Sequence, residues 1–154
     1  MDVKLINPFI EAFYNVMPQI GFFKIEKGEV YLKEKHLSGT GVLINLGLVG
    51  DFKGNIIYGI DLESAKKIAS TMMMGMPVSE LDDMAQSAIS ELTNMLTANA
   101  SINFSNMGKN INISTPTLIY GDKIEIKVNT DKVLCIKILV DDIPIEINVA
   151  IHIT

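Results

Sequence analysis

The sequence predicts an α+β fold, a mostly antiparallel sheet of about six strands with three helices packed on it. Two observations lead to this fold class. Three segments repeat apolar residues at helical spacing, and the other segments are short runs rich in Ile, Val and Leu that alternate with polar residues or are almost wholly apolar. The order is a helix, three strands, two helices and then three or four strands, which favours one sheet with helices against it.

A single domain is expected over residues 1–154. The chain is 48% hydrophobic and 20% charged, so it can bury a sizeable core. No Gly/Ser/Pro-rich linker divides it. Residues 1–4 do not begin a charged leader with an apolar run, and no segment has the roughly 18 uninterrupted apolar residues of a membrane span. These features predict a cytoplasmic protein with no membrane segment.

Each of the three helices has recognisable ends. The first is predicted over residues 5–19, where apolar residues form one stripe. The second is predicted over about 62–74, and Asp61 is a good N-cap for it. The third is expected to begin near Glu80, with Ser79 as its cap, and to run to about residue 105.

Strand signals fill the rest of the chain. The almost wholly apolar run 42–50 predicts a central strand covered on both faces. Residues 51–54 suggest a hairpin turn, and 141–142 a second turn. The alternating run 143–153 would leave an exposed edge if it were unpaired. The remaining predicted strands are 22–26, 30–32, 55–60, 111–114, 123–128 and 133–140.

Charge and residue types exclude several functions. The net charge is −5, all 13 basic residues are Lys, and no basic cluster stands out, which argues against nucleic-acid binding. Without Arg, bidentate phosphate clamps are absent. Cys135, the single cysteine, is expected to be a small buried hydrophobe. His36 and His152 have no Ser or Cys in an elbow-like context, so no hydrolytic triad and no metal site are predicted.

The third helix carries a polar strip of Ser87, Glu91, Asn94 and Ala98, which share a narrow arc at about 100° per residue. The arc expected to face the core contains Leu81, Ala85, Ala88, Leu92, Met95 and Leu96. The strip presents a carboxylate beside a carboxamide. Taken alone, the pair is compatible with a solvated helix face or with a site that acts on the chemistry of a partner.

Further features accompany this strip. Pro116 follows the segment Ser87-x-x-x-Glu91-x-x-Asn94, and a strand punctuated by Gly47, Gly50 and Gly54 precedes it. Together they resemble the CheC/CheX/FliY family of bacterial chemotaxis phosphatases over nearly the whole chain. The size and the single copy of the motif are most similar to CheX-type members. Ala98 departs from the glycine expected before Asn99.

The resemblance implies that the protein removes the phosphoryl group from the aspartyl phosphate of a CheY-like response regulator. It makes Glu91 and Asn94 the catalytic pair, with Ser87, Glu91 and Ala98 contacting the partner and Pro116 as framework. Asn94 would position the attacking water, since an amide accepts and donates hydrogen bonds without adding charge. Glu91 would pair with a lysine of the regulator. No metal or cofactor of the chain's own is expected, because the regulator supplies Mg²⁺.

The resemblance also implies a homodimer, since CheX-like proteins extend their sheets across two subunits. Two alternatives to an enzyme remain. One is a non-catalytic binding or adaptor module of the chemotaxis and flagellar switch system. The other is a structural dimerisation domain in which the strip is simply solvated.

Overall fold

A computed structural model describes residues 3–153. Met1, Asp2 and Thr154, which belong to the predicted single domain over 1–154, lie outside the described residues. The helices are α1 (Asn7–Val16), α2 (Leu62–Met72) and α3 (Asp83–Asn106), with 3₁₀ turns at Val3–Ile6 and Met17–Ile20. The strands are β1 (Ile25–Lys27), β2 (Tyr31–Gly50), β3 (Phe52–Ile60), β4 (Ile111–Ile113), β5 (Thr117–Val140) and β6 (Ile143–Ile153).

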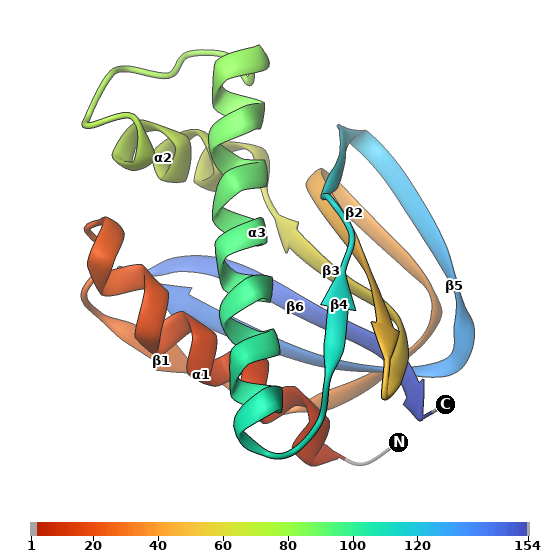
Figure 1. Cartoon of the computed structure of the whole chain (residues 1–154). Coiled ribbons are helices and arrows are strands. Elements are labelled where there is room, and N and C mark those ends of the chain that lie inside the picture. The colour runs from red at the N-terminus through yellow and green to blue at the C-terminus, as the bar shows by residue number, and fades with distance from the viewer. Residues whose placement is uncertain (1–2, 154) are drawn as a thin grey trace.

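The predicted α+β class is confirmed: six strands form one sheet in which the described pairings are all antiparallel. The sheet order is β1-β5-β6-β3-β2-β4, and β5 also pairs with β2. This additional pairing makes a closed circuit through β2, β3, β6 and β5. Figure 1 shows the resulting curl, with the three helices gathered on one side and the long β2–β5 pair arching away from them.

Two strands are much longer than the sequence predicts. The runs 30–32 and 42–50 belong to the single strand β2, and 123–128 and 133–140 belong to β5. The interval between the predicted runs 30–32 and 42–50 is not a break, and Gly41 accommodates a bulge within β2. Its φ is +129°, and a Cβ there would lie 2.6 Å from the carbonyl oxygen of Ile60. The hairpin turn expected over 51–54 is also shorter, because β3 already begins at Phe52.

Strand β6 has no free edge. It pairs with β3 on one side, from Phe52↔Ile153 to Gly59↔Glu146, and with β5 on the other. The alternating pattern of 143–153 therefore comes from a strand in the middle of the sheet. The sheet order ends at the short strands β1 and β4, and residues 31–41 of β2 pair with β5 alone. An exposed β6 edge consequently gives no reason for dimerisation.

The curl produces two apolar clusters, one on each face of the sheet. The larger cluster lies between the helices and the sheet. In it, the ring of Phe104 packs between two other aromatic rings, with its centroid 5.6 Å from that of Phe9 and 5.3 Å from that of Phe52. The smaller lies on the opposite face and contains Leu37, Leu43, Ile57, Val128, Val133, Cys135 and Ala150. Residues 42–46 of β2 alternate between the two clusters or lie half-buried, which confirms the doubly covered strand over this part of the predicted run 42–50. At the end of the run, Val49 and Gly50 are exposed.

The helix starts depend on aspartates. The prediction for Asp61 is confirmed, since its carboxylate accepts a 2.9 Å hydrogen bond from the Ser64 amide at the start of α2. The prediction for Ser79 is wrong: α3 begins later, where Asp82 accepts a 2.9 Å bond from the Ala85 amide. A carboxylate at this position also interacts favourably with the helix dipole, which a serine hydroxyl does not.

Within the described part of the chain, no helix is long and apolar enough to cross a membrane.

Candidate active site

The predicted polar strip lies on the outer side of α3. Ser87 and Glu91 are exposed, and Asn94 and Ala98 are half-buried. The buried side is rotated from the predicted one. Ala88 and Met95 are only half-buried, whereas the buried positions are Ala85, Ile89, Leu92, Thr93, Leu96, Thr97, Ala100 and Phe104. Thr93 and Thr97 thus face the core. Because the prediction counted only apolar residues, it placed the centre of the buried side of α3 too close to Met95.

Hydrogen bonds hold α3 against the sheet behind the strip. The Thr97 hydroxyl oxygen lies 2.9 Å from that of Tyr58 on β3, and both side chains are buried. Thr97 also donates to the carbonyl oxygen of Thr93 over 2.7 Å, and Thr93 donates to that of Ser90 over 2.9 Å. The buried hydroxyls are therefore satisfied, as such groups must be. Their positions determine the direction in which the opposite side of α3 faces.

Asn94 differs from the next two asparagines of the helix. Asn99 accepts a 3.1 Å bond from Asn15 of α1, and Asn103 donates over 2.9 Å to the carbonyl oxygen of Pro8. These two amides bind α3 to α1. Within residues 3–153, the Asn94 amide and the Glu91 carboxylate have no hydrogen-bond or ion-pair partner. Both remain available to a molecule that approaches α3.

Pro116 ends the three-residue connection between β4 and β5. Strand β4 runs back along α3 and packs beside it (Figure 1). Pro116 thus lies on the segment that directly follows the strand packed beside α3. Its fixed φ makes the backbone beside this part of α3 stiffer.

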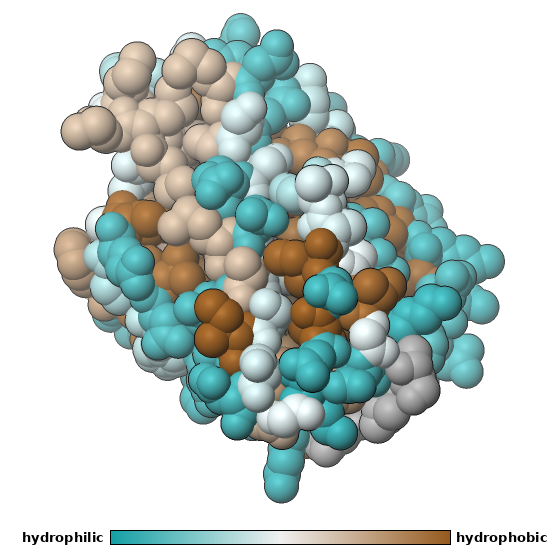
Figure 2. All heavy atoms as spheres, viewed as in Figure 1, coloured by the Kyte–Doolittle hydropathy of each residue, from teal (hydrophilic) through white to brown (hydrophobic). Residues whose placement is uncertain are grey.

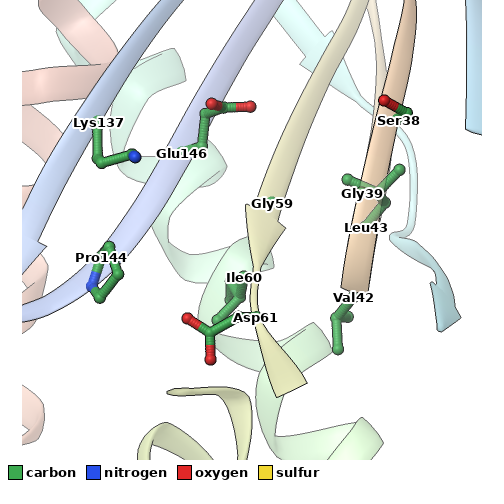
Figure 3. Close-up of a pocket in the computed structure, with 10 residues that line it drawn as sticks. All are labelled: Ser38, Gly39, Val42, Leu43, Gly59, Ile60, Asp61, Lys137, Pro144 and Glu146. Atoms are coloured by element: carbon green, nitrogen blue, oxygen red, sulfur yellow. The ribbon is translucent and has the colours of Figure 1, made fainter. Parts of the chain in front are cut away.

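A separate pocket of about 270 Å³ opens where β2, β3, β5 and β6 meet, and none of the predicted site residues lines it. Figure 3 shows Glu146 and Lys137 on neighbouring strands of this pocket, with Asp61 further along it. The Asp61 carboxylate already caps α2. Glu146 accepts hydrogen bonds from Lys33 and, over 2.6 Å, from Tyr31. The two carboxylates therefore have structural partners.

The pKa of Glu146 reflects these partners. Burial alone would raise it, but the hydrogen bonds from Lys33 and Tyr31 and the charge of Lys33 hold the pKa below its ordinary value. Nearby Cys135 is buried as predicted, and its thiol lies 3.0 Å from the Asn148 side-chain oxygen. Burial raises the pKa of this thiol to about 12. The structure thus gives these groups packing and pairing roles.

The histidines do not form a site with one another. His36 Nδ1 lies 2.7 Å from a carboxylate oxygen of Glu125 on the exposed β2–β5 pair. His152 is exposed near the end of β6. Among the described residues, no group of three or more His, Cys, Asp or Glu side chains could hold a metal ion.

Comparison with known proteins agrees with this geometry. The profile of the family described as chemotaxis phosphatase CheX matches residues 42–139, a range that contains the polar strip and Pro116. The chain belongs to this family. A relative from Thermotoga maritima, named CheY-P phosphatase CheX, is 29% identical over 127 residues, which are 82% of each chain.

Solved structures show how widely this CheX family fold is shared. A CheX–CheY–BeF₃–Mg²⁺ complex from Borrelia burgdorferi contains a chain with a TM-score of 0.81 and 27% identity, covering 98% of this chain and 99% of that one. A chemotaxis protein CheX from Desulfovibrio desulfuricans has a TM-score of 0.84 and 23% identity, over 98% and 99% of the two chains. Thermotoga maritima FliY has a TM-score of 0.73 at 18% identity, covering 96% and 86%, and shares the fold.

Proposed function

We propose that this protein hydrolyses the aspartyl phosphate of a CheY-like response regulator. The observation that carries the proposal is the partner-free Glu91–Asn94 pair on the outer side of α3, at positions where a solvent-facing helix can meet another protein. Family membership and the named activity of the Thermotoga maritima relative support it. The Borrelia burgdorferi complex, in which a CheX is bound to CheY, supports a regulator as the partner.

The proposed chemistry needs little from the chain beyond positioning. An aspartyl phosphate is a mixed anhydride, and its hydrolysis requires a water in line with the scissile phosphorus–oxygen bond. The Asn94 amide oxygen accepts a hydrogen bond from that water and orients it. The water oxygen forms a bond to phosphorus as the bond from phosphorus to the aspartyl oxygen breaks, which regenerates the carboxylate and releases inorganic phosphate that carries the protons of the water. Mg²⁺ held by the regulator neutralises the phosphoryl charge, so the absence of Arg from this chain is compatible with the reaction.

The neighbouring residues have docking roles in this proposal. Glu91, one helical turn before Asn94, pairs with a regulator lysine. Ser87 and Ala98 are small, which allows the regulator backbone to approach the helix. Pro116 stiffens the backbone beside the site. The homodimer implied by the family resemblance remains part of the proposal, and light scattering at micromolar concentration tests it.

The deciding experiment follows the decay of a CheY-like receiver domain labelled with acetyl phosphate. We expect catalytic amounts of the chain to accelerate phosphate release in the presence of Mg²⁺. Decay at the spontaneous rate, together with measurable binding to the receiver, would instead favour the adaptor alternative. Decay at the spontaneous rate without binding would remove the regulator as a partner.

A further inference from the structure

A set of exposed apolar side chains adjoins the polar strip. Met74 in the α2–α3 loop is 96% exposed, Met76 55% and Met84, near the start of α3, 63%. Further along α3, Met95 is half-buried and Ile102 is 56% exposed. We call these five residues the methionine surface. Figure 2 shows a moderately apolar, tan surface that extends from the α2–α3 loop down along α3, interrupted midway by hydrophilic teal atoms.

The helical part of this surface surrounds the proposed docking residue. At about 100° per residue, Met84, Met95 and Ile102 project within about 20° of one another. Glu91 lies within about 40° of each of them by the same geometry. A protein that places a lysine on Glu91 must therefore also cover apolar side chains before and after it along the helix. The methionine surface is thus continuous with the proposed regulator site.

Met74 combines a left-handed backbone conformation with an almost fully exposed side chain, and neither contributes to the packing of the core. Its φ of +61° is left-handed, a conformation that glycine or asparagine usually supplies at the end of a helix. Two hydrogen bonds nevertheless fix the loop. The Gly75 amide donates to the Ser70 carbonyl oxygen over 2.8 Å, and the Ser70 hydroxyl donates to the Met76 carbonyl oxygen over 2.8 Å. A long apolar side chain is therefore held out in solvent by an ordered loop.

Charge restricts the kind of partner that fits here. Between residues 68 and 108 the chain has four acidic residues and no lysine or arginine. The acidic residues, all exposed, are Glu80, Asp82, Asp83 and Glu91. Anionic lipid and nucleic acid would be repelled by this surface. The complementary partner has an apolar patch with a basic group beside it, and flexible methionine side chains can adapt to such a patch.

We propose that the methionine surface is the docking surface for the receiver domain of the CheY-like regulator. Its side chains pack against an apolar patch next to the receiver's phosphoaspartate and lysine, and they determine affinity rather than the chemical step. This inference rests on the proposed function and extends it from two polar residues to a recognition surface. Met74 and Met84 are its specificity-determining residues.

The test compares Met74→Ser/Met84→Ser with Met107→Ser, a single substitution of the same type at the opposite end of α3, where Met107 is 60% exposed. Calorimetry measures the Kd for a CheY-like receiver domain activated with BeF₃⁻ and Mg²⁺, and phosphate release gives kcat. We expect the double variant to weaken binding at least tenfold and to keep kcat within twofold. Met107→Ser should change neither quantity by more than twofold, and both variants should keep the wild-type melting temperature.

Other outcomes would overturn the inference in distinguishable ways. A wild-type Kd for the double variant, with normal wild-type turnover, removes the methionine surface from docking and leaves the proposed function intact. A loss of kcat at unchanged Kd assigns these residues to the chemistry instead. A change from dimer to monomer at unchanged Kd makes the surface a contact between copies of this chain. A wild-type chain that neither binds nor dephosphorylates the receiver removes the proposed function together with this inference.

Discussion

The hydroxyl groups of Tyr58 on β3 and Thr97 on α3 share a buried hydrogen bond, with 2.9 Å between their oxygens. Thr97 gives its own proton to the Thr93 carbonyl oxygen, so Tyr58 is the donor in this bond. Thr97 follows Asn94 by one helical turn and faces the core. The bond therefore stabilises the rotation of α3 that turns the Glu91–Asn94 pair outward.

Removing the two ends of this bond should have unequal effects. Thr97→Val leaves the buried Tyr58 hydroxyl without an acceptor and should cost about 1–3 kcal/mol of unfolding free energy. Tyr58→Phe removes one bond and leaves Thr97 still bonded to Thr93, so about 1 kcal/mol is expected. Adding Tyr58→Phe to Thr97→Val should recover part of the loss. Urea denaturation measures all three, and a larger cost for Tyr58→Phe than for Thr97→Val would contradict this assignment of the donor.

Asn94→Ala should reduce kcat for receiver dephosphorylation by roughly 100-fold or more, because the attacking water loses the group that orients it. The Kd for the receiver activated with BeF₃⁻ and Mg²⁺ should stay within about twofold, since the amide is proposed to contact the water. Asn106→Ala, at the exposed end of the same helix, is the matched control and should be silent. Normal turnover by Asn94→Ala would rule out its proposed role.

Glu91→Lys should act mainly on binding. A lysine at this position would repel the regulator lysine, and affinity should fall by about 10- to 100-fold with a smaller effect on kcat. The loss should shrink at high salt, where exposed charges are screened. Glu11→Lys makes the same charge change at an exposed position of α1 and should not weaken binding. Tight binding combined with a loss of turnover in Glu91→Lys would exchange the roles of the two site residues.

Glu146→Gln should make stability less dependent on pH in the acid range. The folded pKa of Glu146 lies below its ordinary value, so its ionised form stabilises the fold above that ordinary value, and this contribution is lost as the pH falls through the folded pKa. We expect a cost of about 1–2 kcal/mol at pH 7 that diminishes below about pH 4. Glu125→Gln is the exposed control, with an expected cost under about 0.5 kcal/mol. A pH-independent cost would show that packing rather than charge is lost.

Local pattern was enough to predict much of the candidate site. Helical periodicity places Ser87, Glu91, Asn94 and Ala98 on one side of α3, and the structure leaves that side exposed or half-buried. The Asp61 cap and the strand over 42–50 could likewise be predicted from the sequence, because capping and burial periodicity involve neighbours a few residues apart. The roles of the pair depend on a partner and stay predictions.

The pairing of strands that are distant in the sequence could not be predicted in the same way. The predicted runs 30–32 and 42–50 form one strand, because β2 continues through a bulge at Gly41 and pairs with both β3 and β5. The exposed edge considered for 143–153 does not exist, since β3 and β5 cover both sides of β6. An alternating pattern shows which side chains share a face, but it does not identify the neighbouring strand.

The sequence by itself determined the fold class, the central apolar strand and the polar strip of α3, because each depends on short-range periodicity. Only the tertiary structure decided that the sheet closes through β2 and β5, that Tyr58 and Thr97 hold the rotation of α3, and that the Met74 side chain of the methionine surface is exposed. Met95 illustrates the difference: its spacing suits the core, yet packing against α1, α2 and the sheet leaves it at the margin. Such competition for burial is settled by all the contacts of the fold together.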